Sequence, residues 1–277
     1  MAVKIVTDRT ADIPSQLVKD LDIAVIPLYV IFGSTSYRSG IDITEDEFYQ
    51  KLQGPVWPTT SQPTPQDFVD VYNQCAKGAD GILSIHLSSK LSGTINAADQ
   101  AKKLANVKCP IEIIDSLEVS MATGLIVVAA ARMAKAGKRL TEIAESVRKM
   151  VTNTKLLILF DTLEYLAKGG RIGKAKSILG SILNVKPLLT LKDGEFVPVT
   201  QVHSRSKGKE KLLEFVRNAK DIEALAVVYT TTPDEAKELA ASITTIPKAS
   251  IIVAQVGSAL GVHGGPGALA IAMRTKS

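Results

Sequence analysis

The sequence predicts an α/β protein: a three-layer α/β/α domain with a parallel sheet, followed by a smaller two-layer α/β domain with a mixed sheet. In the first half, short β-branched runs alternate with helical segments of ten or more residues, which implies parallel βαβ units with helices on both faces of the sheet. After about residue 155 a hairpin signal appears, because Asp193-Gly194 suits a type I′ turn. We therefore place the two domains at residues 1–155 and 156–277.

The expected elements of the first half alternate between strand and helix. Thr44 and Thr64 each precede a helix start, because a threonine hydroxyl accepts hydrogen bonds from exposed N–H groups, and Pro65 suits the first helical position. Residues 54–65 are rich in Pro, Thr and Ser and are expected to form a loop. Strands are expected at residues 4–7, 23–32, 81–85 and 111–115, and helices from about 14, 44, 64 and 97, with a long Ala-rich helix after 115.

The second half is expected to mix hairpin and crossover connections. A helix with a Lys/Gly/Arg end follows the first strand, and the Asp-Gly turn joins the next two strands. Strands are expected at residues 156–160, 188–190, 196–202, 225–229 and 251–256, and further helices at 207–218 and after 232. Gly261 to Gly267 is too glycine-rich for a sheet interior, so we expect a turn in which His263 faces a ligand.

Composition excludes several classes of function. Hydrophobic residues make up 45% and charged residues 22%, which is typical of a globular protein with a full core. The net charge of +5 comes without a basic run or interleaved aromatics, so nucleic-acid binding is not indicated. No apolar run is long enough to span a bilayer and no signal peptide is apparent, so a cytoplasmic protein is expected. Cys75 and Cys109 are expected to be reduced thiols, and no metal-ligand spacing occurs.

Four loops with small polar residues follow expected strands, at residues 7–12, 58–63, 88–94 and 115–124. In open α/β sheets, ligands bind outside the carboxyl ends of strands. Ser92 precedes Gly93 at the start of a helix, where unpaired N–H groups and the helix dipole favour an anion. The alternative is that Ser92 and Thr94 only cap that helix. The loop lacks the glycine spacing and lysine of a P-loop, so nucleotide binding is not indicated.

Two further features leave a binding and a solvated interpretation open. Pro58 and Pro63 stiffen a segment that carries Thr60 and Ser61, and stiff hydroxyl-bearing backbone suits preorganised hydrogen bonding to a ligand. Residues 168–173 and 203–208 place cations at helix starts, against the preference of the dipole. These two segments are either contacts for a phosphate or an acidic partner, or solvated loops.

Taken together, seven segments resemble the DegV family. They occur in the family's order and cover the chain from end to end: TDRTADIP, PTTSQPTP, SIHLSSKLSGTINAA, DSLEVSMATGL, LEYLAKGGRIG, KPLLTLKDGEF and GVHGGPGALA. The resemblance implies an α/β/α domain with a five-stranded parallel sheet joined to a smaller α/β domain, a fold related to that of dihydroxyacetone kinase. One departure is Arg9, where many members have serine, and this substitution is expected to affect the mouth of the pocket.

The resemblance also implies a function. Family members bind a long-chain fatty acid, such as palmitate, between the domains. They serve as the non-catalytic, lipid-carrying subunit of fatty acid kinase, whose ATP-binding subunit forms an acyl phosphate for phospholipid synthesis. No cofactor or metal is implied. The resemblance places the carboxylate on Thr60 and Ser92. Near it are Ser61, Gly93, Thr94 and His263, and the kinase-facing or phosphate-contacting residues are Arg171 and Arg205.

Two other functions fit the sequence less well. A hydrolase would use Ser92 with His86 or His263, and an orienting acid is available at the strand ends. However, the strained G-x-S-x-G turn of such enzymes is absent. A small-ketone site held through histidine, as in dihydroxyacetone kinase, fits poorly with three histidines and a hydroxyl-rich loop. The candidate orienting acids are Asp8, Asp12 and Asp115.

Overall fold

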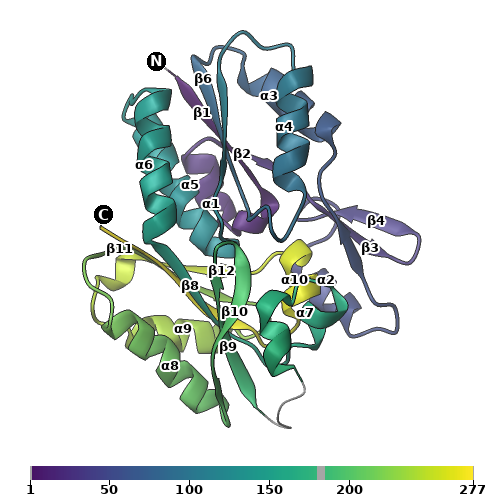
Figure 1. Cartoon of the computed structure of the whole chain (residues 1–277), viewed down its shortest axis with the longest axis vertical. Coiled ribbons are helices and arrows are strands. Elements are labelled where there is room, and N and C mark those ends of the chain that lie inside the picture. Colours follow the sequence, from purple (N-terminus) through teal and green to yellow (C-terminus); the bar gives the residue numbers. More distant parts are fainter. Residues whose placement is uncertain (1, 180–184, 277) are drawn as a thin grey trace.

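A four-stranded parallel sheet is the framework of the N-terminal half (Figure 1). The computed structural model describes residues 2–179 and 185–276. The strand order is β2 (Ile23–Ile26), β1 (Val3–Asp8), β6 (Gly81–His86) and β7 (Ile111–Asp115), and all neighbours run parallel. The central strands are buried on both faces, as their β-branched runs predict. The α/β/α architecture is confirmed.

The five strands implied for this sheet are a point of difference, because the described residues place four strands in it. The expected extended stretch at 23–32 is divided at Pro27-Leu28. Its second part joins a separate antiparallel sheet with the order β4 (Thr35–Arg38), β3 (Tyr29–Phe32) and β5 (Thr59–Ser61). The expected loop at 54–65 was therefore wrong in part, since it contains the edge strand β5. Thr60 pairs with Val30 in this sheet, so the backbone of Thr60 is fixed by strand pairing.

Helices cover both faces of the parallel sheet. α3 (Pro65–Cys75) and α4 (Thr94–Leu104) pack on one face, and α5 (Ser120–Lys135) and α6 (Leu140–Asn153) pack on the other. α1 (Ser15–Asp20) and α2 (Glu45–Leu52) lie in the connections before them. Thr44 and Thr64 form the expected caps: each hydroxyl accepts a backbone N–H of its own first turn, in a reciprocal capping box. α4 begins at Thr94, three residues earlier than expected.

A six-stranded mixed sheet forms the C-terminal half (Figure 1). Its order is β10 (Glu195–Val202), β9 (Lys186–Lys192), β8 (Thr154–Leu159), β13 (Leu269–Thr275), β11 (Ile222–Tyr229) and β12 (Ile251–Gln255), and only β11 and β12 pair in parallel. The predicted Asp193-Gly194 turn joins β9 to β10, with φ of 53° and 82° as a type I′ turn requires. The mixed sheet is confirmed.

Shorter elements complete this half. α8 (Arg205–Arg217) and α9 (Pro233–Ser242) cover one face of the mixed sheet. α7 (Glu164–Lys168) and α10 (Ser258–Gly264) lie beside each other between the two halves (Figure 1). The 3₁₀ turns are η1 (Arg9–Ala11), η2 (Gly173–Ile178) and η3 (Lys248–Ser250). Neither α10 nor β13 was predicted.

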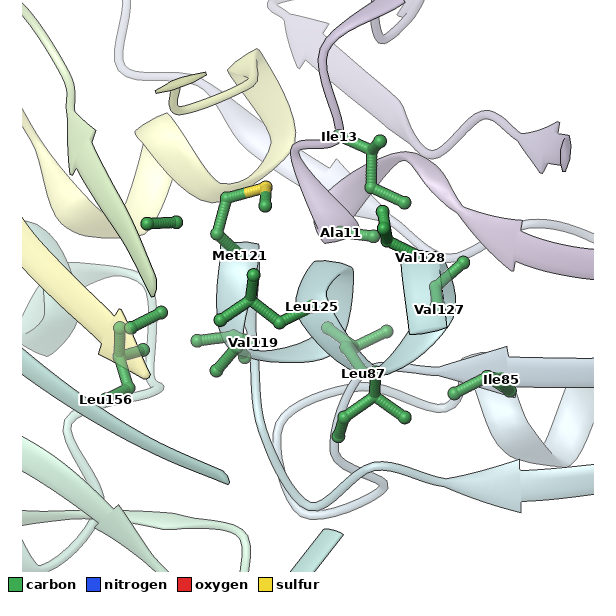
Figure 2. Packing of buried hydrophobic residues seen from close by; sticks show 14 of the residues in the cluster. Ala11, Ile13, Ile85, Leu87, Val119, Met121, Leu125, Val127, Val128 and Leu156 are labelled. Atoms are coloured by element: carbon green, nitrogen blue, oxygen red, sulfur yellow. The ribbon is translucent and has the colours of Figure 1, made fainter. Parts of the chain in front are cut away.

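α5 lies between the two sheets and packs against both. It contacts β1 and β6 of the parallel sheet and β8, β11 and β13 of the mixed sheet. Figure 2 shows Met121 and Leu125 of α5 between Ala11 and Ile13 on one side and Leu156 of β8 on another. A helix that is apolar on all sides belongs in a core. The domain boundary expected after residue 155 falls inside β8. α5 connects the parallel sheet of the N-terminal half to the mixed sheet of the C-terminal half.

Two cysteines and the helix lengths complete the description. Cys75 is buried, Cys109 is half-buried, and both are free thiols. In the part of the chain that the structure describes, no helix has the length and apolar character needed to cross a membrane. Within the same residues, no group of three or more His, Cys, Asp or Glu side chains is arranged to hold a metal ion.

Candidate ligand site

A cavity of about 540 Å³ lies between the carboxyl ends of the parallel strands and the mixed sheet. Loops that follow β1, β6 and β7 form one wall, as the topology of an open α/β sheet predicts. The opposite wall comes from β8, β11 and β13, and α10 closes a third side. The volume is within the range of roughly 300–1,000 Å³ that is usual for small-molecule sites. Apolar lining residues include Leu87, Leu91, Val119, Leu156, Ile158, Phe160, Phe196, Val228, Leu260 and Ala270.

The few polar side chains in the interior of this cavity already have protein partners. The Thr10 hydroxyl donates to Asp8, and the Ser120 hydroxyl donates to Asp12 at 2.6 Å. The Thr230 hydroxyl accepts the N–H of Ala268 at 2.9 Å. Because their hydrogen bonds are directed into the protein, these groups make few demands on a ligand. The interior therefore suits a hydrocarbon.

Hydroxyl groups line the cavity where the segment after β5 approaches the loop before α4, since Gln62 lies against Gly93; we call this side the hydroxyl end. Thr60 Oγ1 lies 3.0 Å from His263 Nε2, and both residues line the cavity. Ser92 also lines it, and its Oγ lies 2.9 Å from Thr94 Oγ1 and accepts the Thr94 N–H at 3.3 Å. The structure thus brings Thr60, Ser92 and His263 to one cavity although they lie far apart in sequence. The N-cap residue of α4 is Gly93, so Ser92 does not cap the helix from the N-cap position, although its oxygen accepts the first N–H of the helix and can still donate to a ligand.

His263 was expected in a glycine turn, and that expectation was wrong. It lies in the last turn of α10, because the chain resumes a helix at Ser258 after β12. Its Nδ1 is buried without a hydrogen-bond partner among the described residues. Burial, and secondarily the guanidinium of Arg171, lower the pKa of His263 to about 4. The imidazole is therefore neutral at physiological pH, and it lies so close to Gly169 that a Cβ there would overlap the ring.

The other predicted residues occupy different positions. Ser61 lines the cavity, whereas Thr94 is fully buried beneath Ser92 and supports it. Gly93 allows close approach of Gln62, because a Cβ at Gly93 would overlap the Gln62 amide. Gln62 lines the cavity and was missed by sequence reasoning, although it lies in the Thr-Thr-Ser-Gln segment that was singled out.

The two predicted arginines lie in different surroundings. Arg171 lines the cavity, and its Nε and Nη1 donate to the carbonyls of Leu91 at 3.2 Å and Gly169 at 2.7 Å. Arg205 is not among the residues that line the cavity. It makes ion pairs with Asp161 at 3.1 Å and Glu235 at 2.6 Å. Only Arg171 is placed to contact a ligand in the cavity directly.

Comparison with known proteins identifies the family. A model of the DegV family matches residues 2–276. A DegV domain-containing protein of Streptomyces coelicolor is 37% identical over 279 residues, which are 99% of each chain. This chain belongs to the DegV family. The resemblance noted in the sequence is thus confirmed.

Two solved structures share this fold over nearly the whole chain. One is described as showing fatty acid binding of a DegV protein from Thermus thermophilus; it is 31% identical, with a TM-score of 0.92 and 100% of both chains covered. The other is described as a stearic acid-binding protein from Eubacterium ventriosum; it is 26% identical, with a TM-score of 0.89, and the match covers 99% of this chain and 98% of that one.

A Ser-His-Asp arrangement does occur in this DegV protein, but not at Ser92. His86 Nδ1 lies 2.9 Å from Asp8, and His86 Nε2 lies 2.6 Å from the hydroxyl of Ser84. The Tyr72 hydroxyl donates to the same serine at 2.9 Å. All four side chains are fully buried, so they form a core network beneath the cavity. Neither His86 nor His263 is hydrogen-bonded to Ser92 in the described part of the chain.

Two surface features distinguish the surroundings of the DegV cavity here. Arg9, the departure noted in the opening segment, forms an ion pair with Glu45 of α2 and does not line the cavity. Trp57, just before β5, stacks on Tyr165 of α7 with ring centroids 4.9 Å apart. Lys168 Nζ lies 4.2 Å from the centre of the Trp57 ring. This stack connects the N-terminal half to the C-terminal half beside the hydroxyl end of the cavity.

Proposed function

We propose that this protein binds one long-chain fatty acid in the cavity, with the carboxylate at Thr60 and Ser92, and presents it to an ATP-binding fatty acid kinase subunit. The observation that carries the proposal is an apolar cavity that ends in two preorganised hydroxyls. The descriptions of the Thermus and Eubacterium proteins support the class of ligand.

The apolar part of the cavity matches the tail in size. A methylene group fills about as much space as a water molecule in the liquid, roughly 30 Å³, so a chain of sixteen to eighteen carbons needs about 500 Å³. The cavity volume of about 540 Å³ accommodates such a chain. Each buried methylene contributes about 0.8 kcal/mol, so ten of them contribute about 8 kcal/mol, enough to offset much of the entropic cost of association. Palmitate is therefore a suitable ligand.

The hydroxyl end matches a carboxylate in its donors. If neutral His263 donates its Nε2–H to Thr60 Oγ1, the Thr60 hydroxyl proton is free for the ligand. If the Thr94 hydroxyl donates to Ser92 Oγ, which also accepts the Thr94 N–H, the Ser92 proton is likewise free for the ligand. Two donors of this kind bind one carboxylate without a buried ammonium group. Hydrogen bonds to a charged acceptor contribute about 1.5–3 kcal/mol each.

The surroundings of the Thr60 and Ser92 hydroxyls support presentation of the carboxylate to a kinase. Ser92 has no histidine bonded to it, so the cavity contains no activated nucleophile at that serine. A carboxylate held by two hydroxyls keeps lone pairs for attack on a phosphoryl group. Among the described residues, Arg171 is the cation that lines the cavity. We propose that it stabilises the negative charge that develops during phosphoryl transfer. Arg205, held by Asp161 and Glu235, would act through the surface that faces the partner.

Native mass spectrometry tests the ligand. Protein purified from a bacterial host is expected to carry an added mass equal to one fatty acid, and delipidated protein is expected to take up one palmitate. Protein that is purified empty and takes up no palmitate would disprove the proposal.

A Thr60→Ala, Ser92→Ala double variant tests the carboxylate site. Losing two hydrogen bonds to a charged group should weaken palmitate binding by about tenfold to a hundredfold per bond, and acyl phosphate formation with a partner kinase and ATP should fall to near the background. The matched control is Thr59→Ala, Ser89→Ala, which removes exposed hydroxyls from the same strand and loop. Equal turnover by both variants would show that the carboxylate lies elsewhere.

A further inference from the structure

α10 is attached to the N-terminal half at both of its ends. At its start, the N–H of Gly257 donates to Asp12 Oδ1 at 2.9 Å. At its end, His263 Nε2 lies 3.0 Å from Thr60 Oγ1. Between these two points, Ala259 and Leu260 line the cavity. The seating of α10 therefore determines both the shape of one cavity wall and the position of the histidine at the hydroxyl end.

Asp12 is the residue that joins this helix to the other walls. Its second carboxylate oxygen accepts the hydroxyl of Ser120 at 2.6 Å, and Ser120 is the first residue of α5 and lines the cavity. Asp12 has φ of 50° and Ser120 has φ of 53°, a conformation that non-glycine residues seldom adopt. Backbone strain of this kind persists where the surrounding structure holds it, and it is concentrated at functional sites. Two strained residues thus meet at one buried carboxyl group.

The surroundings of this carboxyl group favour its protonated form. Asp12 is 4% exposed. Arg9 of η1 provides the nearby positive charge, but Arg9 also pairs with Glu45 of α2, and Tyr49 of α2 is the other titratable neighbour. α5 and α10 contribute only the Ser120 hydroxyl and the Gly257 N–H. Burial outweighs these hydrogen bonds and the Arg9 charge, and it raises the pKa of Asp12 from 3.8 to about 7.

We propose that Asp12 is a proton-controlled latch for α10: while its carboxyl group is protonated, α10 stays seated and the cavity retains its ligand, and loss of the proton loosens α10. Protonated Asp12 can accept the Gly257 N–H through its carbonyl oxygen and donate to Ser120. Ionised Asp12 is a poorly solvated charge that gains hydration when α10 lifts from it. The identity of the retained ligand rests on the proposed function, whereas the latch itself does not.

The direction of the pH effect follows from linkage. The seated state holds the proton up to about pH 7, and a hydrated carboxyl group releases it near its ordinary value of 3.8. The seated state therefore binds more protons between these values, so a rise in pH favours the loosened state. Between about pH 4 and pH 7 the opening equilibrium should increase by up to tenfold per pH unit, and above about pH 7 it should level off, because Asp12 is then ionised in both states.

Amide hydrogen exchange of residues 256–264, corrected for the intrinsic exchange rate at each pH, tests the latch without any ligand. In the wild-type protein, the opening equilibrium should rise steeply with pH up to about pH 7 and level off above it. Asp12→Asn should keep α10 protected across this range, because the amide is neutral and can still accept from Gly257. Asp221→Asn is the matched control: Asp221 has φ of 53° but is exposed, and this variant should behave as the wild type. The same pH response in all three proteins would overturn the proposal.

A second variant keeps the test decisive if Asp12→Asn does not fold. The Ser120 hydroxyl donates to Asp12 and so stabilises the ionised form. Ser120→Ala should raise the pH at which α10 opening levels off, a shift that a purely structural role for Asp12 would not produce. An unshifted pH of levelling would contradict the latch. Palmitate dissociation measured over the same pH range should accelerate in parallel with α10 opening. A protein that never binds palmitate yet shows the exchange pattern would refute the proposed ligand and leave the latch standing.

Discussion

His263 owes its position to the missing side chain of Gly169. A Cβ at Gly169 would overlap the imidazole, whose Nε2 is the partner of Thr60. Gly169→Ala should therefore displace the ring and break the hydrogen bond between His263 Nε2 and Thr60 Oγ1. Palmitate binding should weaken by about tenfold, which corresponds to the loss of one hydrogen bond. Gly54→Ala is the control, because it adds the same methyl group at an exposed position outside the cavity lining. Titration of both variants with palmitate measures the effect, and equal affinities would mean that the position of His263 does not matter.

Some residues of the site could be predicted from the sequence because their signals are local. Ser92 could be recognised as an anion-binding hydroxyl because a serine before a helix start has a local physical meaning. Thr60 drew attention through the flanking prolines, but its pairing with Val30 in a sheet was not visible. Asp12 was visible only as a candidate orienting acid, because its bond to Gly257 joins residues more than two hundred positions apart. The ligand-binding roles of Thr60 and Ser92 stay predictions.

The β9–β10 hairpin reaches across to the loop that carries the candidate site. The Ser88 hydroxyl donates to the carbonyl of Gly194 at 2.8 Å, and a Cβ at Gly194 would overlap that hydroxyl. Gly194→Ala should cost more than the roughly 1–2 kcal/mol of placing alanine at positive φ, because the hairpin tip must also withdraw. The control is Gly137→Ala, which has φ of 76° but open space around it. Chemical denaturation of both variants compares the two losses; equal losses would mean that the docking of the hairpin is not important.

Elements with local signals were predicted and elements without them were missed. The Asp193-Gly194 hairpin and the Thr44 and Thr64 caps depend on residues adjacent in sequence, and all three are confirmed. α10 was taken for a turn because its glycines are poor helix formers. The structure shows why they are tolerated: a Cβ at Gly261 would overlap Phe48 of α2. That close packing is a tertiary contact, and no pattern within the segment reveals it.

The two halves of the molecule share one core. The largest buried cluster includes Leu83 of the parallel sheet, Leu125 of α5 and Ala272 of the mixed sheet. Because α5 cannot leave one sheet without exposing its other face, the halves should unfold together in one cooperative transition. Calorimetry should give equal calorimetric and van't Hoff enthalpies for the delipidated protein. Two resolved transitions would show that the sheets are independently stable. The α/β class followed from alternating strands and helices, but a helix shared between two sheets did not.

The stack of Trp57 on Tyr165 gives the protein an optical probe of its own. Trp57 is the only tryptophan in the chain, and it belongs to the N-terminal half while Tyr165 and Lys168 belong to the other. Its emission therefore reports on one contact, free from the overlapping signals that complicate most spectra. We expect a lipid whose binding shifts one half against the other to change this emission, so that lipids of different length and saturation can be compared by titration with no dye, radiolabel or partner enzyme.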